Sequence, residues 1–277
     1  MSFATWARRF ALPSLADKRW KSLTALKPSL TEAQKASYDR DGFLVIEQMF
    51  STEEMSAVRE RIFDLVHGKV PIPAGVKFEV QSTADVQASA DVPRFRQIWD
   101  IVPAEPILTA GVTLNAKLIA ALKGLLGPDL RLFRATAMLK PRRIGSDLPY
   151  HQDSAYWPIR PMGLVSCWVA VDDATIANGC MRVIPGLHKK GLVPFETKSR
   201  SGVTYQEMVL DERDRAREIS LEMPSGSCLM FHSLLPHATG PNRSDMNRFA
   251  MISSFMSSRS VPTDAGSIRD YLLVSGK

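Results

Sequence analysis

Cysteine is scarce in this chain of 277 residues, because Cys167, Cys180 and Cys228 are the only three and all lie in apolar segments. An odd number of buried cysteines argues against a disulfide framework and favours reduced thiols in a cytoplasmic protein. No C-x-x-C pair is present, which argues against a thiolate zinc site. No stretch approaches the roughly 20 apolar residues that cross a bilayer, so we expect no membrane span.

Acidic residues are scarce at the N-terminus. Residues 1–28 contain six lysines and arginines but one acidic residue, Asp17, and they carry five of the six net positive charges. The remaining body is almost neutral, so we expect no nucleic-acid partner. We interpret residues 1–28 as a basic N-terminal extension that packs on its own domain or on a partner subunit. The alternative is a mitochondrial targeting segment, since Arg8 and Arg9 lie in an amphipathic stretch.

Helices are predicted mainly in the first half of the chain. Capping residues and apolar residues at helical spacing predict helices over residues 31–41, 51–66 and 114–126. Residues 70–93 are rich in Pro, Ala and Ser without clear periodicity, and they predict a loop over the body of the protein.

Short apolar runs separated by turns dominate the chain from Leu130 onward. The runs predict strands over residues 130–139, 165–171, 181–184, 228–231 and 249–255. A further short buried strand is predicted at 43–46. Residues 189–220 are charged and helical in tendency, and they predict an insertion between strands. Helices first and strands later indicate an α+β fold, in which N-terminal helices buttress one antiparallel sheet and residues 29–277 form a single domain.

A candidate metal site begins at His151 and Asp153. Two residues that are two positions apart point to the same side of an extended backbone, so both side chains can bind one ion. With one distant histidine they can occupy one face of an octahedral Fe(II). His232 and His237 are the two candidates for that third ligand. Gln152 points the opposite way, so we expect it to support the ligands rather than to bind metal.

Arg248 follows His237 by eleven residues and begins a predicted strand. Its side chain would share one face of that strand with Ala250 and Ile252. An arginine inside a barrel is costly unless an anion pairs with it, and its planar fork suits a dicarboxylate.

Several segments resemble the phytanoyl-CoA dioxygenase family, a branch of the Fe(II)/2-oxoglutarate oxygenases. They are Asp-Gly-Phe-Leu-Val-Ile-Glu at 41–47, Tyr-His-Gln-Asp at 150–153 with Tyr-Trp-Pro at 156–158, Asn-Gly-Cys at 178–180, Ile-Pro-Gly-Leu-His at 184–188, and 237–248. The resemblance implies a double-stranded β-helix core, the cupin-like jelly roll. It also implies Fe(II) bound by His151, Asp153 and His237, because the His-Ala-Thr-Gly-Pro-Asn segment that begins at His237 matches the family motif.

The resemblance extends to residues that contact 2-oxoglutarate. It implies that Arg248 and Thr239 bind the C5 carboxylate and that Trp168 packs along the cosubstrate. It places Thr136 at a cosubstrate contact and Gln97 near the C1 carboxylate. Ordinary core packing is the alternative for Trp168 and Thr136.

The predicted activity is a dioxygenase reaction. Fe(II), 2-oxoglutarate and O2 would oxidise a C–H bond of a small metabolite, with release of succinate and CO2. Asp153 favours hydroxylation over halogenation, because related halogenases lack this carboxylate. The alternatives are a metal-dependent cupin-type oxygenase or isomerase without 2-oxoglutarate, and a non-catalytic family member.

The substrate is left open by the sequence. Tyr150, Tyr156, Trp157 and Arg160 are candidate wall residues, and Arg160 hints at an anionic substrate. A fatty acyl-CoA, an amino acid, a phosphonate and a secondary-metabolite intermediate are all compatible with them. We expect a monomer or a homodimer.

Overall fold

A computed structural model describes residues 29–80, 95–200, 203–263 and 271–276. The predicted basic extension, residues 1–28, lies outside the described residues, as does the 81–93 part of the predicted loop.

The larger of two main sheets has eight strands, and every strand pair among the described residues is antiparallel. Its order is β1-β12-β7-β14-β4-β3-β2, with β16 also paired to β4. The strands are β1 (Phe43–Ile46), β2 (Lys77–Val80), β3 (Phe95–Trp99), β4 (Leu130–Lys140), β7 (Val165–Ala170), β12 (Cys228–His232), β14 (Arg248–Ser257) and β16 (Leu273–Ser275).

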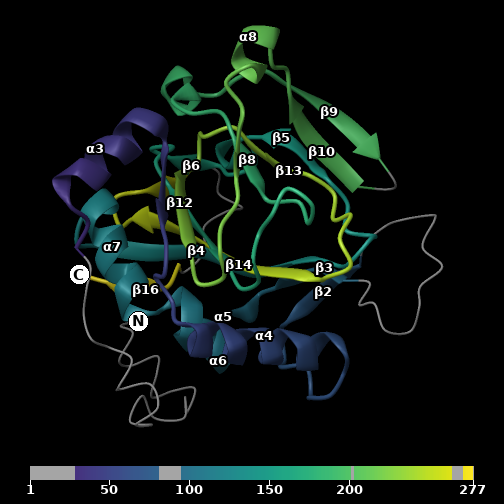
Figure 1. The fold of residues 1–277 in the computed structure, drawn as a ribbon. Helices are drawn as coiled ribbons and strands as arrows, with labels where there is room; N and C mark the ends of the chain where they lie inside the picture. The colour runs from purple at the N-terminus through teal and green to yellow at the C-terminus, as the bar shows by residue number, and fades with distance from the viewer. Residues whose placement is uncertain (1–28, 81–94, 201–202, 264–270, 277) are drawn as a thin grey trace.

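The smaller main sheet has four strands in the order β11-β8-β13-β5, and it lies on one side of the larger sheet (Figure 1). These strands are β5 (Leu148–His151), β8 (Met181–Val183), β11 (Ile219–Leu221) and β13 (His237–Thr239). Two further pairs are β9 (Phe195–Arg200) with β10 (Val203–Met208), and β6 (Ile159–Arg160) with β15 (Val261–Pro262). The two facing sheets form the predicted jelly-roll core.

Helices cover the other side of the larger sheet, where α4, α5 and α6 lie beneath it in Figure 1. The helices are α3 (Glu32–Asp41), α4 (Thr52–Val66), α5 (Ile101–Ala104), α6 (Pro106–Leu108), α7 (Ala116–Leu126) and α8 (Glu212–Arg215), with single turns η1 (Thr109–Thr113), η2 (Asp153–Ala155) and η3 (Leu187–Lys190). Thr31 and Ser51 each form a capping box, which explains why α3 and α4 begin where the sequence predicts.

Alternation along β14 divides the interior into two layers. Phe249, Met251 and Phe255 belong to the core between the larger sheet and the helices. Ala250 and Ile252 belong to the layer between the two sheets. Since side chains at even positions of β14 point between the sheets, Arg248 also points there, as the sequence predicts.

Two segments differ from their predictions. The regular structure described within residues 189–220 is mainly strand, in β9, β10 and the start of β11, so the predicted helical tendency is wrong except in the end of η3 and the short α8. Charged residues recur at a period of two in Phe-Glu-Thr-Lys-Ser-Arg of β9, and this pattern favours a strand over a helix. Lys77–Val80 of the predicted loop is a strand, β2, because it pairs with β3.

Within the described ranges, no single helix has the length and apolar composition to cross a membrane. One pair of helices bent by 50°, Pro106–Thr113 followed by Ala116–Leu126, passes the same test together. Leu108, Leu118 and Leu122 of this pair are buried in the core.

Candidate metal and cosubstrate site

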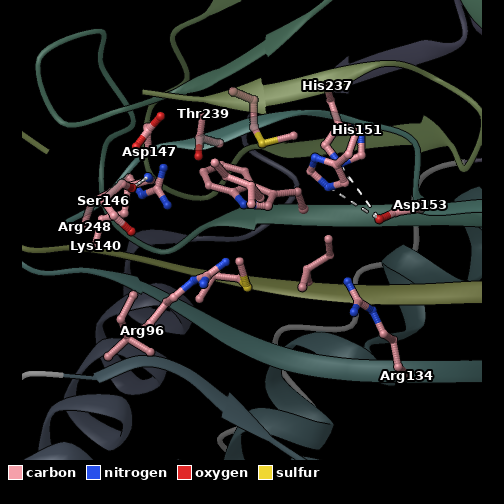
Figure 2. Close-up of a pocket in the computed structure, with 16 residues that line it drawn as sticks. Arg96, Arg134, Lys140, Ser146, Asp147, His151, Asp153, His237, Thr239 and Arg248 are labelled. Atoms are coloured by element: carbon pink, nitrogen blue, oxygen red, sulfur yellow. Dashed lines mark hydrogen bonds and ion pairs between the residues drawn. The ribbon is translucent and has the colours of Figure 1, made fainter. Parts of the chain in front are cut away.

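The three predicted metal ligands meet between the two sheets. His151 ends β5 and His237 begins the neighbouring strand β13, and the two residues lie directly opposite each other in the strand register. Asp153 follows at the first position of η2. The strand pairing thus brings together residues that are 86 positions apart in the sequence, and Figure 2 shows both rings facing Asp153.

Their geometry suits one metal ion. Nε2 of His151 lies 4.0 Å from Oδ1 of Asp153, and Nε2 of His237 lies 3.9 Å from the same oxygen. One ligand atom from each residue lies within 4.8 Å of the other two. Each Nδ1 lies 2.9 Å from a backbone carbonyl, of Pro149 and Leu235 respectively, so each Nδ1 carries the proton and each Nε2 is free to bind metal. Two histidines and one carboxylate on one side of an ion are the ligand set of non-haem Fe(II) oxygenases.

The carboxylate is held by a serine that the sequence reading missed. Ser166 on β7 donates a hydrogen bond of 2.9 Å to Oδ2 of Asp153, which leaves Oδ1 directed at the histidines. Ser254 on β14 lies 2.9 Å from the Ser166 hydroxyl. Strand alternation supplies the missed signal, because Ser166 lies two residues before the predicted pocket residue Trp168 and shares its face.

Burial keeps the first histidine neutral. Burial and the neighbouring His237 lower the pKa of His151 to about 3. A neutral imidazole is the form that binds a metal ion, so His151 is in the form that a metal ligand needs at neutral pH.

Arg248 lies at the opposite end of the same pocket and is 1% exposed. It donates one hydrogen bond, to the carbonyl of Gly179, and its guanidinium carbon lies 5.2 Å from the centre of the Trp168 ring. Gly179 has a φ of 82°, and a Cβ there would collide with the Gly240 carbonyl. Nε of Arg248 has no partner among the described residues, which also form no ion pair with this side chain. Burial lowers its pKa to about 10, with Asp172 acting in the opposite direction, so the guanidinium remains a cation at neutral pH.

The pocket between these ends holds about 610 Å³ of empty space, its open mouth included. Thr239 and Trp168 line it, as predicted for residues that contact the cosubstrate. Thr136 lies on the face of β4 that carries the pocket residues Arg134 and Met138. It is fully buried, and its hydroxyl has no partner among the described residues. Gln97 is buried beside the pocket and is absent from its lining. The sequence analysis placed Ile252 on the Arg248 face, and Ile252 lines the pocket. The lining also contains residues that the sequence analysis missed, namely Arg96, Arg134, Met138, Leu139, Lys140, Ser146, Asp147, Leu148 and Met181.

The four candidate substrate residues lie outside this lining. The Tyr150 hydroxyl donates to Glu218, and the Tyr156 hydroxyl accepts a hydrogen bond of 2.7 Å from the backbone of β10. Tyr156 is 43% exposed, and its ring meets that of His151 edge-on at 6.0 Å. Trp157 packs in a small core cluster, and Arg160 is exposed.

The competing histidine lies elsewhere in the fold. His232 ends β12, and its ring lies beside that of His188, with 5.3 Å between centroids. The side chain of Gln152 bonds the backbone of Gly191, Val193 and Leu234, so it holds the loops around the site and does not point at the ligands.

Comparison with known proteins places the chain in a family. Residues 38–250 match the family model of phytanoyl-CoA dioxygenase. The chain belongs to the phytanoyl-CoA dioxygenase family. A "Probable phytanoyl-CoA dioxygenase" of Caenorhabditis elegans is 30% identical over 232 residues, which cover 80% of this chain and 74% of the relative. The peroxisomal phytanoyl-CoA dioxygenase of Mus musculus is 28% identical over 235 residues, which cover 83% of this chain and 69% of the relative.

Solved structures confirm the fold of this phytanoyl-CoA dioxygenase family member. The α-ketoglutarate-dependent epimerase SnoN from nogalamycin biosynthesis aligns with a TM-score of 0.67 at 16% identity, over 89% of this chain and 96% of SnoN. EctD from S. alaskensis with 2-oxoglutarate and 5-hydroxyectoine aligns with a TM-score of 0.67 at 20% identity, over 89% of this chain and 85% of EctD. The protein is accordingly an oxidoreductase, an Fe(II)- and 2-oxoglutarate-dependent dioxygenase, and the alternatives without cosubstrate or without catalysis are not favoured.

Proposed function

We propose that His151, Asp153 and His237 bind Fe(II), that Arg248 binds the C5 carboxylate of 2-oxoglutarate, and that the enzyme oxidises a C–H bond of a small metabolite. The observation that carries this proposal is a pocket with two different ends. One end has a converging ligand set with one carboxylate, and the other has a buried guanidinium whose Nε has no partner among the described residues. A dicarboxylate that binds metal at one end satisfies both ends at once.

The residues between the two ends orient the cosubstrate. Trp168 forms a flat wall that holds Arg248 in place, and Thr239 offers a hydroxyl beside it. Lys140 lies close by, and its amine donates a hydrogen bond to the carbonyl of Ser146. Burial, together with the charge of Arg248, lowers the pKa of Lys140 well below its usual value. Arg248 is therefore the stronger candidate for a fixed cation, since a guanidinium keeps its charge when buried.

Iron and 2-oxoglutarate supply the oxidising chemistry when they are bound, and the cosubstrate is converted to succinate and CO2 as O2 is consumed. The chain positions the metal ligands and excludes water from them. Ser166 fixes the carboxylate, the two backbone carbonyls fix the imidazoles, and the layer around Ile252 keeps water from the ligands.

Residues 29–277 act in this proposal as one catalytic domain. The site takes residues from both sheets, and the helices share a continuous core with the larger sheet. A cytoplasmic location and a monomeric or homodimeric state stay predictions.

Titration of 2-oxoglutarate into the Fe(II)-loaded protein without oxygen tests the cosubstrate site. We expect Arg248→Ala to weaken 2-oxoglutarate binding by about ten- to a hundredfold, because one or two charge-assisted hydrogen bonds are lost. Arg248→Lys should also weaken it, since an ammonium cannot form two parallel bonds. Arg243→Gln removes an exposed arginine of the preceding turn and serves as the control. An unchanged affinity in both Arg248 variants would remove the basis for this site.

A further inference from the structure

A second arginine points into the pocket at its metal end. Arg134 lies on β4, and it lines the pocket together with His151 and Asp153. In Figure 2 its guanidinium rises from the larger sheet toward the space below Asp153, well apart from Arg248. The residue lies two positions before Thr136 and therefore shares the pocket face of β4.

Two indole rings fix the orientation of this side chain. The guanidinium carbon of Arg134 lies 5.5 Å from the centre of the Trp99 ring and 5.0 Å from that of Trp157. Trp99 is held by a hydrogen bond of 2.9 Å to Glu79, and Trp157 packs on Phe133 at 4.8 Å between centroids. Contact with aromatic rings restrains a guanidinium while leaving its N–H groups free to donate.

Arg134 has no hydrogen bond or ion pair with any described residue, and its Nε is buried without a partner. Two other cations of the pocket have partners, since Arg96 pairs with Glu79 at 3.3 Å and Lys140 donates to a backbone carbonyl. Arg248 resembles Arg134 in its unpartnered Nε, and the proposed function already assigns an anion to it. Burial lowers the pKa of Arg134, with Asp153 acting in the opposite direction. Arg134 as a whole is partly exposed to the pocket, and its contacts with two indole rings leave its N–H groups without an acceptor, so the guanidinium is placed to bind an anion that enters the pocket.

We propose that Arg134 binds the carboxylate of the prime substrate, which is a free carboxylic acid with the oxidised C–H bond close to that carboxylate. This inference rests on the proposed function, in which 2-oxoglutarate binds Arg248 and the metal binds His151, Asp153 and His237 on the wall opposite Arg134. A planar fork with one positive charge matches a planar monoanion. A phosphate dianion would leave excess negative charge beside Asp153, so a carboxylate fits better.

The free acid is a different substrate class from that named for the relatives. A coenzyme A thioester converts the carboxylate into a neutral acyl group, and Arg134 would then face no charge. The pocket is also lined by the apolar residues Met138, Leu148 and Ile252, which suit an apolar chain or ring. We therefore expect the enzyme to prefer an apolar acid over its thioester.

Equilibrium dialysis of the oxygen-free protein, loaded with Fe(II) and 2-oxoglutarate, tests the charge requirement. The probes are straight-chain fatty acids from butanoate to dodecanoate, their primary amides and their coenzyme A thioesters. We expect at least one acid to bind at least tenfold more tightly than its amide and its thioester, since both lack the charged partner. If no acid binds, or if the amides or thioesters bind as tightly as the acids, the proposal is overturned. This comparison uses only the wild-type protein, so it does not depend on the folding of a variant.

Variants then identify the residue responsible. Arg134→Gln should weaken binding of the acid by about ten- to a hundredfold and leave its amide unaffected, while Arg134→Lys should restore part of the loss. Arg259→Gln removes an exposed arginine outside the pocket and is the matched control. Unchanged acid binding in Arg134→Gln overturns the proposal, and so does a loss of 2-oxoglutarate affinity without a loss of acid binding. Wild-type protein that binds neither Fe(II) nor 2-oxoglutarate refutes the proposed function instead.

Discussion

His151 and His237 have ring centroids 4.1 Å apart, and His188 and His232 have ring centroids 5.3 Å apart. Both pairs join distant parts of the chain, and burial lowers the pKa of a histidine in each pair. Within the described ranges, only the first pair converges with a carboxylate, Asp153, to form a group of three potential ligands.

The two histidine pairs also differ in which ring nitrogen has a free lone pair. Backbone carbonyls lie against Nδ1 of both His151 and His237, so their Nε2 atoms carry lone pairs that face one another across the site. Nδ1 of His232 instead accepts a hydrogen bond of 3.0 Å from the backbone N–H of Leu234, so the ring proton belongs on Nε2. Proximity of two histidines therefore does not make a metal site, because the backbone must also select the tautomer.

The largest effect should follow from removing the carboxylate that distinguishes the pairs. Asp153→Ala should abolish Fe(II) binding and turnover, since it removes the only anionic ligand. His237→Ala should also lose tight Fe(II) binding, whereas His232→Ala should keep it. Calorimetric titration of Fe(II) without oxygen measures all three. Loss of iron in His232→Ala together with retention in His237→Ala would reverse our assignment.

A smaller effect should come from the support of that carboxylate. Ser166→Ala should weaken Fe(II) binding by about ten- to a hundredfold, because partners that orient metal ligands contribute on that scale. Ser253→Ala is a matched control, since Ser253 is a buried serine of the same sheet whose hydroxyl contacts Thr113 on the helix side. Equal metal affinities of the two variants would show that the Ser166 hydrogen bond does not position Asp153.

The sequence was sufficient to predict most of the fold. Capping boxes at Thr31 and Ser51 marked helix starts, because local hydrogen bonds decide them. The apolar runs became the central strands β4, β7, β12 and β14. It failed at the hairpin of β9 and β10, where charged composition was given more weight than the alternation that forms a strand. It also missed β2, whose structure depends on pairing with a distant strand and not on its own residues.

The candidate site was predictable only where a motif covers it. The His151 and Asp153 pair followed from strand alternation, but the pairing of β5 with β13 was needed to bring His237 opposite. Ser166 and Arg134 belong to no motif. Alternation places Ser166 on the face of Trp168, but its bond to Asp153 and the position of Arg134 in the pocket depend on how the strands pack.

The smallest effect should be the pH dependence of stability that His232 contributes, which adds to that of His151 in the metal-free protein. Burial and the neighbouring His188 lower the pKa of His232 from 6.5 to about 4 in the folded protein. His232 is therefore protonated near pH 6.5 in the unfolded chain but stays neutral at that pH in the folded protein. Its contribution to stability is complete above about pH 6.5. It is lost as the pH falls from about 6.5 to about 4. One pKa unit corresponds to about 1.4 kcal/mol, so metal-free wild-type protein should lose about 2 kcal/mol more than His232→Gln between about pH 7 and about pH 5. Urea unfolding at both pH values measures this difference, and identical losses in the two proteins would show that folding does not lower the pKa of His232.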